Sequence, residues 1–258
     1  MGKGCQAHDY GSNVNVGVGL GSDNMLTNRP RVLVAWSSGK DSAWALQVLR
    51  QAGEVEVVGL LTTFNEAFDR VAMHAVRRGL VEAQARAADL PLVNVPLPWP
   101  CSNAAYEEAM GRALAEVRAQ LKITHVAFGD LFLEDVRHYR ESRMQGTGLT
   151  PLFPLWGRPT RTLAREMVSA GLRARLSCVD PKRLAPSYAG RLFDSNLLDE
   201  LPDEVDPCGE RGEFHTFACA GPMFAHPIPV SLGEVVTRDG FVFADLLQGT
   251  DGGGTSEL

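Results

Sequence analysis

Residues 31–42 read RVLVAWSSGKDS, and this stretch decides the fold. An apolar run at 32–36 ends in small polar residues at 37–42, and an apolar, helix-compatible run follows at 43–49. This order predicts a buried strand, a tight loop and the N-terminus of a helix. Such a junction turns backbone N–H groups toward one point, where the helix dipole adds partial positive charge. The stretch therefore predicts an anion site.

The side chains of this loop suit a polyphosphate. Gly39 lets the backbone approach a ligand, Lys40 adds a full charge, and three hydroxyls add donors, those of Ser37, Ser38 and Ser42. The spacing is not that of a Walker A loop, because no glycine stands five residues before Gly39. The alternative is a solvated turn with a surface lysine.

Asp41 directly follows the lysine of the loop. A carboxylate beside phosphates repels them unless it caps the helix or binds magnesium, so Asp41 is a candidate Mg²⁺ ligand.

Composition narrows the class of protein. The 258 residues carry a net charge of −6 and are 45% hydrophobic, typical of one α/β domain or slightly more, with no basic patch for nucleic acid. The five cysteines are scattered without a CxxC pair, which favours a reducing cytoplasm over a disulfide framework. No run approaches the roughly 18 apolar residues of a membrane span.

Strands and helices are expected to alternate up to residue 148. After a disordered leader at 1–29, strands are predicted at 55–63, 92–97 and 123–128. Helices are predicted at 43–51 and 73–89 and from Ser102 or Asn103 onward. This alternation predicts a doubly wound parallel sheet. Ligands bind beyond its C-terminal strand ends, where the loop and Gly129-Asp130 would both lie.

The remaining chain predicts a smaller domain at 149–248 and a flexible tail at 249–258. The charged stretch 131–145 is either a solvated helix or a wall of the site. Residues 150–156 are expected to link the domains. A helix up to Val168, a strand at 173–179, a mostly helical stretch at 184–201 and a hairpin turning at Asp239-Gly240 follow. Residues 224–230 are either core or an interface in a homo-oligomer.

Residues 206–217, DPCGERGEFHTF, concentrate chemistry in a dozen positions. A strand here would place Glu213 and His215 on one face, which suits proton transfer or the binding of magnesium and substrate. The alternative is a tight turn with satisfied polar groups. Cys208 alone is more typical of a buried filler, and His215 without neighbouring ligands is a poor metal ligand.

Together these motifs resemble the diphthine–ammonia ligase family over about residues 31–247. The set comprises SSGKDS, similar to the SGGKDS loop of ATP pyrophosphatases, then FGDL at 128–131, PLFPLW at 151–156, GERGEFHTF at 209–217 and AGPMF at 220–224. Ser38 stands where that loop more often has glycine.

The resemblance implies a Rossmann-like ATP-binding domain of the adenine nucleotide α-hydrolase type at 30–148. It also implies a smaller C-terminal α+β domain that carries part of the active site. The family activates a carboxylate with ATP and Mg²⁺, releases pyrophosphate, and lets ammonia displace AMP to form an amide. In its named members the acceptor is diphthine, a modified histidine on a translation elongation factor.

The resemblance also assigns residues. Those matching the nucleotide site are Ser37, Ser38, Gly39, Lys40, Asp41, Ser42, Gly129, Asp130 and Arg137. Those expected to act in catalysis are Lys40, Glu210, Glu213 and His215, and those expected to place Mg²⁺ are Asp41 and Asp130. Family members often have Tyr-Gln-Arg after Gly-Asp, where this chain has Asp-Val-Arg at 135–137, so only Arg137 carries over and the acceptor stays open.

Two other functions fit parts of the sequence. The same loop occurs in enzymes that transfer sulfur to tRNA, for which Cys208 is available, although the acidic balance weighs against tRNA. A regulator that binds ATP or AMP without turnover is the second alternative, but it leaves the C-terminal motif unexplained.

Overall fold

The computed structural model describes residues 29–71 and 76–249. Its helices and strands are, in chain order, β1 (Arg31–Ala35), α1 (Lys40–Ala52), β2 (Glu56–Asn65), β3 (Arg70–Val71), α2 (Arg78–Ala87), β4 (Leu92–Leu97), α3 (Asn103–Leu121), β5 (His125–Ala127), α4 (Glu134–Met144), β6 (Thr150–Leu152), α5 (Thr160–Ser169), β7 (Arg173–Val179), the 3₁₀ turn η1 (Pro186–Tyr188), α6 (Ser195–Glu200), β8 (Phe214–Ala220), β9 (Val230–Arg238) and β10 (Phe241–Gln248).

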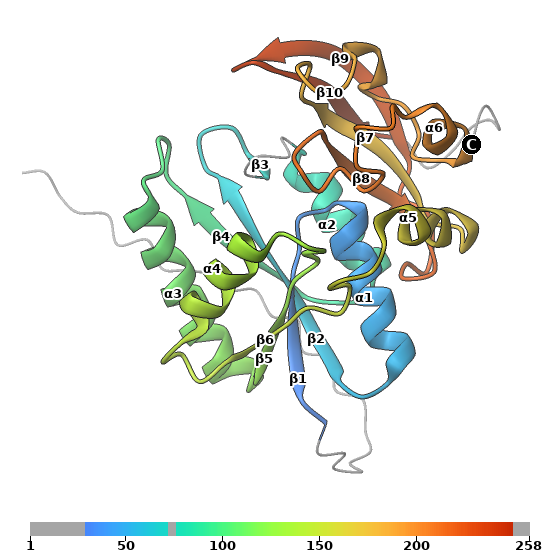
Figure 1. The fold of residues 1–258 in the computed structure, drawn as a ribbon. Coiled ribbons are helices and arrows are strands. Elements are labelled where there is room, and N and C mark those ends of the chain that lie inside the picture. The colour runs from blue at the N-terminus through green and yellow to red at the C-terminus, as the bar shows by residue number, and fades with distance from the viewer. Residues whose placement is uncertain (1–28, 72–75, 250–258) are drawn as a thin grey trace, which may run out of the picture.

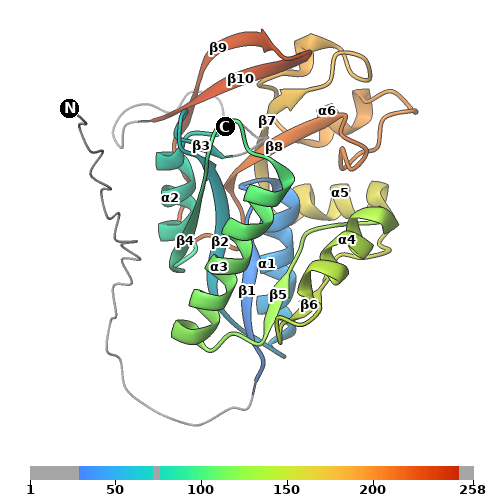
Figure 2. The ribbon, with the colours of Figure 1, turned by 90° about the vertical axis from the view of Figure 1, so that its left-hand side faces the viewer.

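The first sheet has the doubly wound α/β topology that the sequence predicts. Its parallel strands run in the order β4-β2-β1-β5-β6, and the short β3 pairs antiparallel with β2. Side chains of α1 and α2 join one hydrophobic cluster and those of α3 and α4 join another, so the helices cover both faces (Figures 1 and 2). From β1 the chain moves outward to β2 and β4, and it then returns to the other side of β1 to form β5 and β6. This reversal makes the boundary between β1 and β5 the topological switch point, where ligands bind in open α/β sheets.

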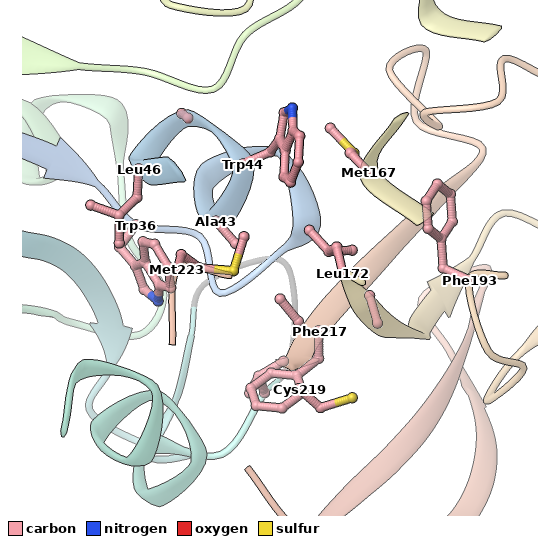
Figure 3. Close-up of a cluster of buried hydrophobic side chains, with 14 of the residues drawn as sticks. Trp36, Ala43, Trp44, Leu46, Met167, Leu172, Phe193, Phe217, Cys219 and Met223 are labelled. Carbon is pink, nitrogen blue, oxygen red and sulfur yellow. The ribbon is translucent and has the colours of Figure 1, made fainter. Parts of the chain in front are cut away.

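A second, antiparallel sheet follows in the order β8-β7-β10-β9. Figure 1 shows it beyond the ends of the parallel strands, on the side where α1 begins. A shared cluster of buried side chains joins the two parts, with Ala43 and Trp44 of α1 near Met167 of α5 and Phe217 of β8 (Figure 3). This packing fixes the C-terminal part against the loop that follows β1.

Two boundaries near the site differ from the sequence prediction. Helix α1 begins at Lys40 instead of Ala43, because extended Gly39 is its N-cap and the Ala43 N–H already donates to the Gly39 carbonyl at 3.1 Å. Residues 150–152, expected within a link, form strand β6 and pair in parallel with β5.

The prediction that residues 184–201 are mostly helical is wrong. Only η1 and α6 are helical, because the intervening chain bonds to β7. The Leu176 N–H donates to the Arg191 carbonyl at 2.9 Å, and the Phe193 N–H donates to the Ala174 carbonyl at 2.8 Å. A partner distant in sequence therefore overrides the local helical pattern.

Other expected segments are shorter or lie outside the described chain. Helix α2 covers 78–87 of the expected 73–89, and residues 73–75 lie outside the described residues, as do 1–28 of the leader and 250–258 of the tail. Phe224 and Ile228 are buried, so residues 224–230 contribute to the core.

Within the described residues, no helix has both the length and the apolar character needed to cross a membrane.

Candidate active site

The loop after β1 is fixed by the second sheet. The Ser38 carbonyl accepts hydrogen bonds from the Ala218 N–H of β8 at 2.9 Å and from Gln84 Nε2 at 2.9 Å. Gln84 is fully buried, and its Oε1 accepts from Trp36 Nε1 at 2.8 Å. Sequence analysis missed Gln84, although an uncharged polar residue on the apolar face of α2 was the available signal.

Ser38 adopts a left-handed backbone conformation, with φ of 70°. Its side chain is buried, and its Oγ has no hydrogen-bond partner among the described residues. The backbone therefore takes the conformation that suits the glycine more often found at this position.

We expect Ser38→Gly to raise the free energy of unfolding by about 1 kcal/mol, because a left-handed conformation costs an L-residue roughly 1–2 kcal/mol and glycine recovers most of it. Urea unfolding measures the change. Lys122→Gly is the matched control. Lys122 also has a left-handed backbone, with φ of 51°, but it is exposed and buries no hydroxyl, so this variant reports the backbone effect alone. A less stable Ser38→Gly protein would contradict the argument.

Lys40 lies inside the protein, with 1% of its surface exposed. Its Nζ donates to Asp41 Oδ2 at 2.8 Å and to the Cys208 carbonyl, and it lies 5.4 Å from the ring centre of Phe193. Burial lowers the pKa of Lys40, but nearby Asp41 more than offsets this, so the pKa is raised and the ammonium stays charged. Lys40 thus connects the loop at 37–42, called the phosphate-type loop below, to the C-terminal motif at 206–217.

The backbone at the start of α1 is also covered by β8. The Lys40 N–H donates to Thr216 Oγ1 at 3.1 Å, and a Cβ on Gly39 would lie 3.2 Å from the Thr216 carbonyl. Thr216 is a contact of the loop that sequence analysis did not single out, although it stands in the matched C-terminal motif.

The motif loop 206–213 is organised by two buried carboxylates. Asp206 accepts from the N–H groups of Cys208 at 2.9 Å and Glu210 at 3.3 Å through Oδ1. Glu213 accepts from the Asp206 N–H and the Arg211 N–H, each at 3.0 Å. Since β8 begins only at Phe214, Glu213 stands before the strand, and both of its oxygens accept hydrogen bonds from the backbone of the loop.

Glycine is required within this loop. Gly209 has φ of 70°, and a Cβ there would lie 2.8 Å from the Phe214 carbonyl. The backbone turn at Gly209 directs the next residue, Glu210, toward the parallel sheet.

Glu210 reaches the switch point of the parallel sheet. Its Oε1 accepts from the Leu131 N–H at 2.8 Å, next to Gly129-Asp130 at the end of β5. Burial raises the pKa of Glu210 to about 7, and the negative charge of Asp41 adds to the rise while the Leu131 hydrogen bond opposes it. A carboxyl group that titrates near neutrality can accept and release a proton at physiological pH.

Gly129 packs directly on the phosphate-type loop. A Cβ at Gly129 would lie 2.9 Å from the backbone carbon of Asp41 and from the Ser42 nitrogen. Asp130 follows, partly buried, with Arg140 Nε at 3.5 Å from its Oδ2. Burial raises the pKa of Asp130, and Arg140 partly offsets the rise.

The two residues expected to place magnesium, Asp41 and Asp130, each have a buried carboxylate oxygen. Among the described residues, Asp41 Oδ1 and Asp130 Oδ2 are buried carboxylate oxygens without a hydrogen-bond partner. No cluster of three or more metal-binding side chains occurs in the described chain. Mg²⁺ nevertheless needs only one or two carboxylates when a nucleotide supplies phosphate oxygens.

The other predicted site residues have different surroundings. His215 pairs with Cys178 across β8 and β7, and burial, then the charge of Lys40, lowers its pKa to about 4. Cys208 is buried, with its Sγ 3.6 Å from the Thr160 carbonyl, and burial raises its pKa. Arg137 lies over the rings of Phe153 and Trp156, and no contact described for it reaches the loop at 37–42.

Comparisons with known proteins identify the family of this chain. Residues 30–151 match a family model described as the diphthamide synthase N-terminal domain, and residues 159–244 match the diphthamide synthase C-terminal domain. The protein named diphthine–ammonia ligase from Danio rerio is 28% identical over 233 residues, covering 83% of this chain and 91% of that protein. The one from Homo sapiens is 27% identical over 234 residues, covering 83% and 88%. From its loop after β1 to its C-terminal motif, this chain belongs to the diphthamide synthase family.

Proposed function

We propose that the protein is an ATP-dependent ligase that joins ammonia to a carboxylate, forming AMP and pyrophosphate. The observation that carries the proposal is the contact between Glu210 and the Leu131 N–H, which brings the C-terminal motif to the end of β5 beside the loop at 37–42. The names of the relatives supply the reaction class. An anion-binding loop and a carboxyl group that titrates near neutrality stand at one switch point, as this reaction needs.

In the proposed reaction the acceptor carboxylate attacks the α-phosphorus of ATP, and the bond to the β-phosphate oxygen breaks. Pyrophosphate leaves and an acyl adenylate remains. Ammonia then attacks the acyl carbon, AMP leaves, and one proton is released. The positive end of the α1 dipole would stabilise the negative charge of the leaving group, and electrostatic stabilisation of this kind is usually the largest catalytic contribution.

Glu210 is proposed to accept the proton from the attacking nitrogen, since its pKa of about 7 matches that task. Glu213 and Asp206 act as positioning residues that hold the motif loop. Asp41 and Asp130 would hold Mg²⁺, which when bound neutralises phosphate charge. Lys40 is proposed to hold the loop at 37–42 against the motif at 206–217 and to supply positive charge beside the phosphates.

The acceptor is proposed to be a carboxylate, with diphthine as the first candidate because the relatives carry it in their names. The test incubates the protein with ATP, Mg²⁺, ammonium and either a diphthine-bearing elongation factor or a mixture of small carboxylates. Equimolar AMP and pyrophosphate, dependent on both acceptor and ammonium, support the proposal. ATP binding without pyrophosphate release with either acceptor favours the regulator instead.

We expect Cys208→Ser to retain activity within about twofold, because a buried thiol with a raised pKa is not the thiolate that sulfur transfer requires. The same AMP and pyrophosphate assay measures it. Cys178→Ser is the matched control for burying a hydroxyl, since Cys178 is equally buried. A loss of activity of 100-fold or more in Cys208→Ser, but not in Cys178→Ser, would support the sulfurtransferase hypothesis.

A further inference from the structure

Gln84 is a buried amide that contacts three separate parts of the chain. Its Nε2 donates to the Ser38 carbonyl at 2.9 Å and to the Ala218 carbonyl at 2.6 Å, and its Oε1 accepts from Trp36 Nε1 at 2.8 Å. The other buried residues of α2 are Leu, Val or Ala, and Gln84 has no exposed surface. Burying an amide among apolar residues is unfavourable unless it forms hydrogen bonds, so these three contacts explain the choice of glutamine here.

The partners of the amide fix its orientation. Trp36 Nε1 can only donate and the two backbone carbonyls can only accept, so a reversed amide would lose all three hydrogen bonds. Trp36 belongs to the buried cluster that joins the two parts of the protein, and its ring meets that of Phe224 edge-on at 6.2 Å (Figure 3). The donors of Gln84 are therefore held in place at the phosphate-type loop.

The direction of the Ser38 carbonyl sets the direction of the next N–H group. This carbonyl accepts from Gln84 and from the Ala218 N–H, so it points toward α2 and β8. A trans peptide is planar, and the Gly39 N–H therefore points to the opposite side. That N–H donates only to Ser37 Oγ at 3.3 Å, beyond the usual range of about 2.7–3.2 Å, and it is available to an anion.

The backbone of Ser38 needs such support. Its φ of 70° is unfavourable for an L-residue, and strained conformations of this kind persist only where surrounding contacts hold them. Gln84 supplies one of the two hydrogen bonds to the Ser38 carbonyl. Without that donor the carbonyl is less constrained, and an oxygen turned toward bound phosphates would repel them.

We propose that Gln84 is a positioning residue for phosphate binding, whose amide holds the Ser38 carbonyl in place and thereby directs the Gly39 N–H toward the phosphates. The inference rests on the proposed function only in taking the phosphate-type loop as the site of the ATP phosphates. A residue that merely stabilised the core would change the free energy of unfolding, but not the affinity of the folded protein for pyrophosphate.

Two variants of Gln84 separate shape from hydrogen bonding. Gln84→Met keeps most of the side-chain volume and removes all three hydrogen bonds. Gln84→Glu keeps the shape and the acceptor for Trp36, but its carboxylate would face two carbonyl oxygens. Burial raises the pKa of such a carboxyl group, to about 8–9 in documented cases, and the protonated form again donates to a carbonyl.

Arg50→Met is the matched control. Arg50 also donates to two backbone carbonyls, those of Met223 at 3.0 Å and of Ala88, and so it also links the α2 region to the C-terminal part. Arg50 stands near the end of α1, whereas the phosphate-type loop leads into its start. Its replacement should lower the free energy of unfolding without changing the binding of pyrophosphate.

The experiment measures the affinity for inorganic pyrophosphate with Mg²⁺ by titration calorimetry, at about pH 6 and about pH 9, on either side of the raised pKa. Each variant is compared with the wild type at the same pH, because Glu210 and His215 titrate in both proteins. We expect Gln84→Met to bind about tenfold more weakly or worse at both pH values, since two donors are lost. Gln84→Glu should show a similar loss at the higher pH and recover most of the wild-type affinity at the lower pH. Arg50→Met should stay within about twofold.

Wild-type pyrophosphate affinity in folded Gln84→Met overturns the inference, and so does a loss in Gln84→Glu that is the same at both pH values. Urea unfolding establishes which variants are folded, and if Gln84→Met is not, the two pH values of Gln84→Glu supply the comparison. If the wild type binds neither pyrophosphate nor ATP, the proposed function itself fails, and this result is distinguishable from the others.

Discussion

Replacing Lys40 with alanine is expected to abolish pyrophosphate release and to lower the free energy of unfolding by about 3 kcal/mol or more. Lys40 is buried against Asp41 and the Cys208 carbonyl, so its removal leaves a largely enclosed carboxylate and a carbonyl without their donor. Removing one member of a buried ion pair typically costs roughly 3–5 kcal/mol. Pyrophosphate release and urea unfolding measure the two effects separately.

Two further variants separate chemistry from packing. Lys40→Met keeps most of the side-chain volume against Phe193 and Phe214, so it should lose less stability than Lys40→Ala. Its loss of pyrophosphate release should be as large as that of Lys40→Ala. Lys182→Ala removes an exposed lysine and should change neither quantity. Wild-type turnover in folded Lys40→Met would show that the charge of Lys40 plays no part in the reaction.

Glu210→Gln is expected to lower kcat at least 100-fold, in line with the loss of a general base. Glutamine keeps an oxygen that accepts from the Leu131 N–H, so the loop should stay in place while the proton acceptor is lost. In the wild type, kcat/KM should rise with pH up to about 7 and then level off, because only the carboxylate form accepts a proton. The measurement is the pH profile of AMP formation for both proteins.

The pH dependence of the free energy of unfolding should also differ between the wild type and Glu210→Gln. Unfolded Glu210 loses its proton near 4.5 and folded Glu210 near 7, so the folded state binds more protons between these values. The free energy of unfolding contributed by Glu210 therefore falls as pH rises from about 4.5 to 7. His215 acts in the opposite direction, since its pKa is lowered to about 4, and the comparison with Glu210→Gln isolates the glutamate.

Exposed Glu204 supplies the control for this series. Glu204→Gln should keep the wild-type pH profile and the wild-type slope of stability against pH. If Glu210→Gln also kept an activity transition near pH 7, another group would have to carry the proton.

The sequence by itself determined the parallel sheet and the position of the phosphate-type loop. Residues 31–42 place a buried strand before small polar residues, and that order alone forces the loop to the C-terminal edge of a sheet. Gly129-Asp130 belongs to the same edge because parallel strands end together, and the structure packs Gly129 on Asp41.

Local patterns also predicted the hairpin at 230–247, and the structure forms it with Asp239-Gly240 at the turn between β9 and β10. The same kind of pattern wrongly predicted a mostly helical stretch at 184–201. There the backbone forms hydrogen bonds with β7, a partner that a local pattern does not reveal.

The tertiary structure alone decided what the site residues touch. Glu213 looked like a candidate for catalysis, but it holds the motif loop, whereas Glu210 spans the two parts of the protein to reach Leu131. The sequence predicts that Lys40 binds phosphate, with a surface lysine as the alternative, and the structure buries it against the carbonyl of Cys208, 168 residues away in sequence. Hydrogen bonds and burial between segments so far apart depend on packing, and a sequence pattern reports only the periodicity and turn preferences of its own neighbourhood.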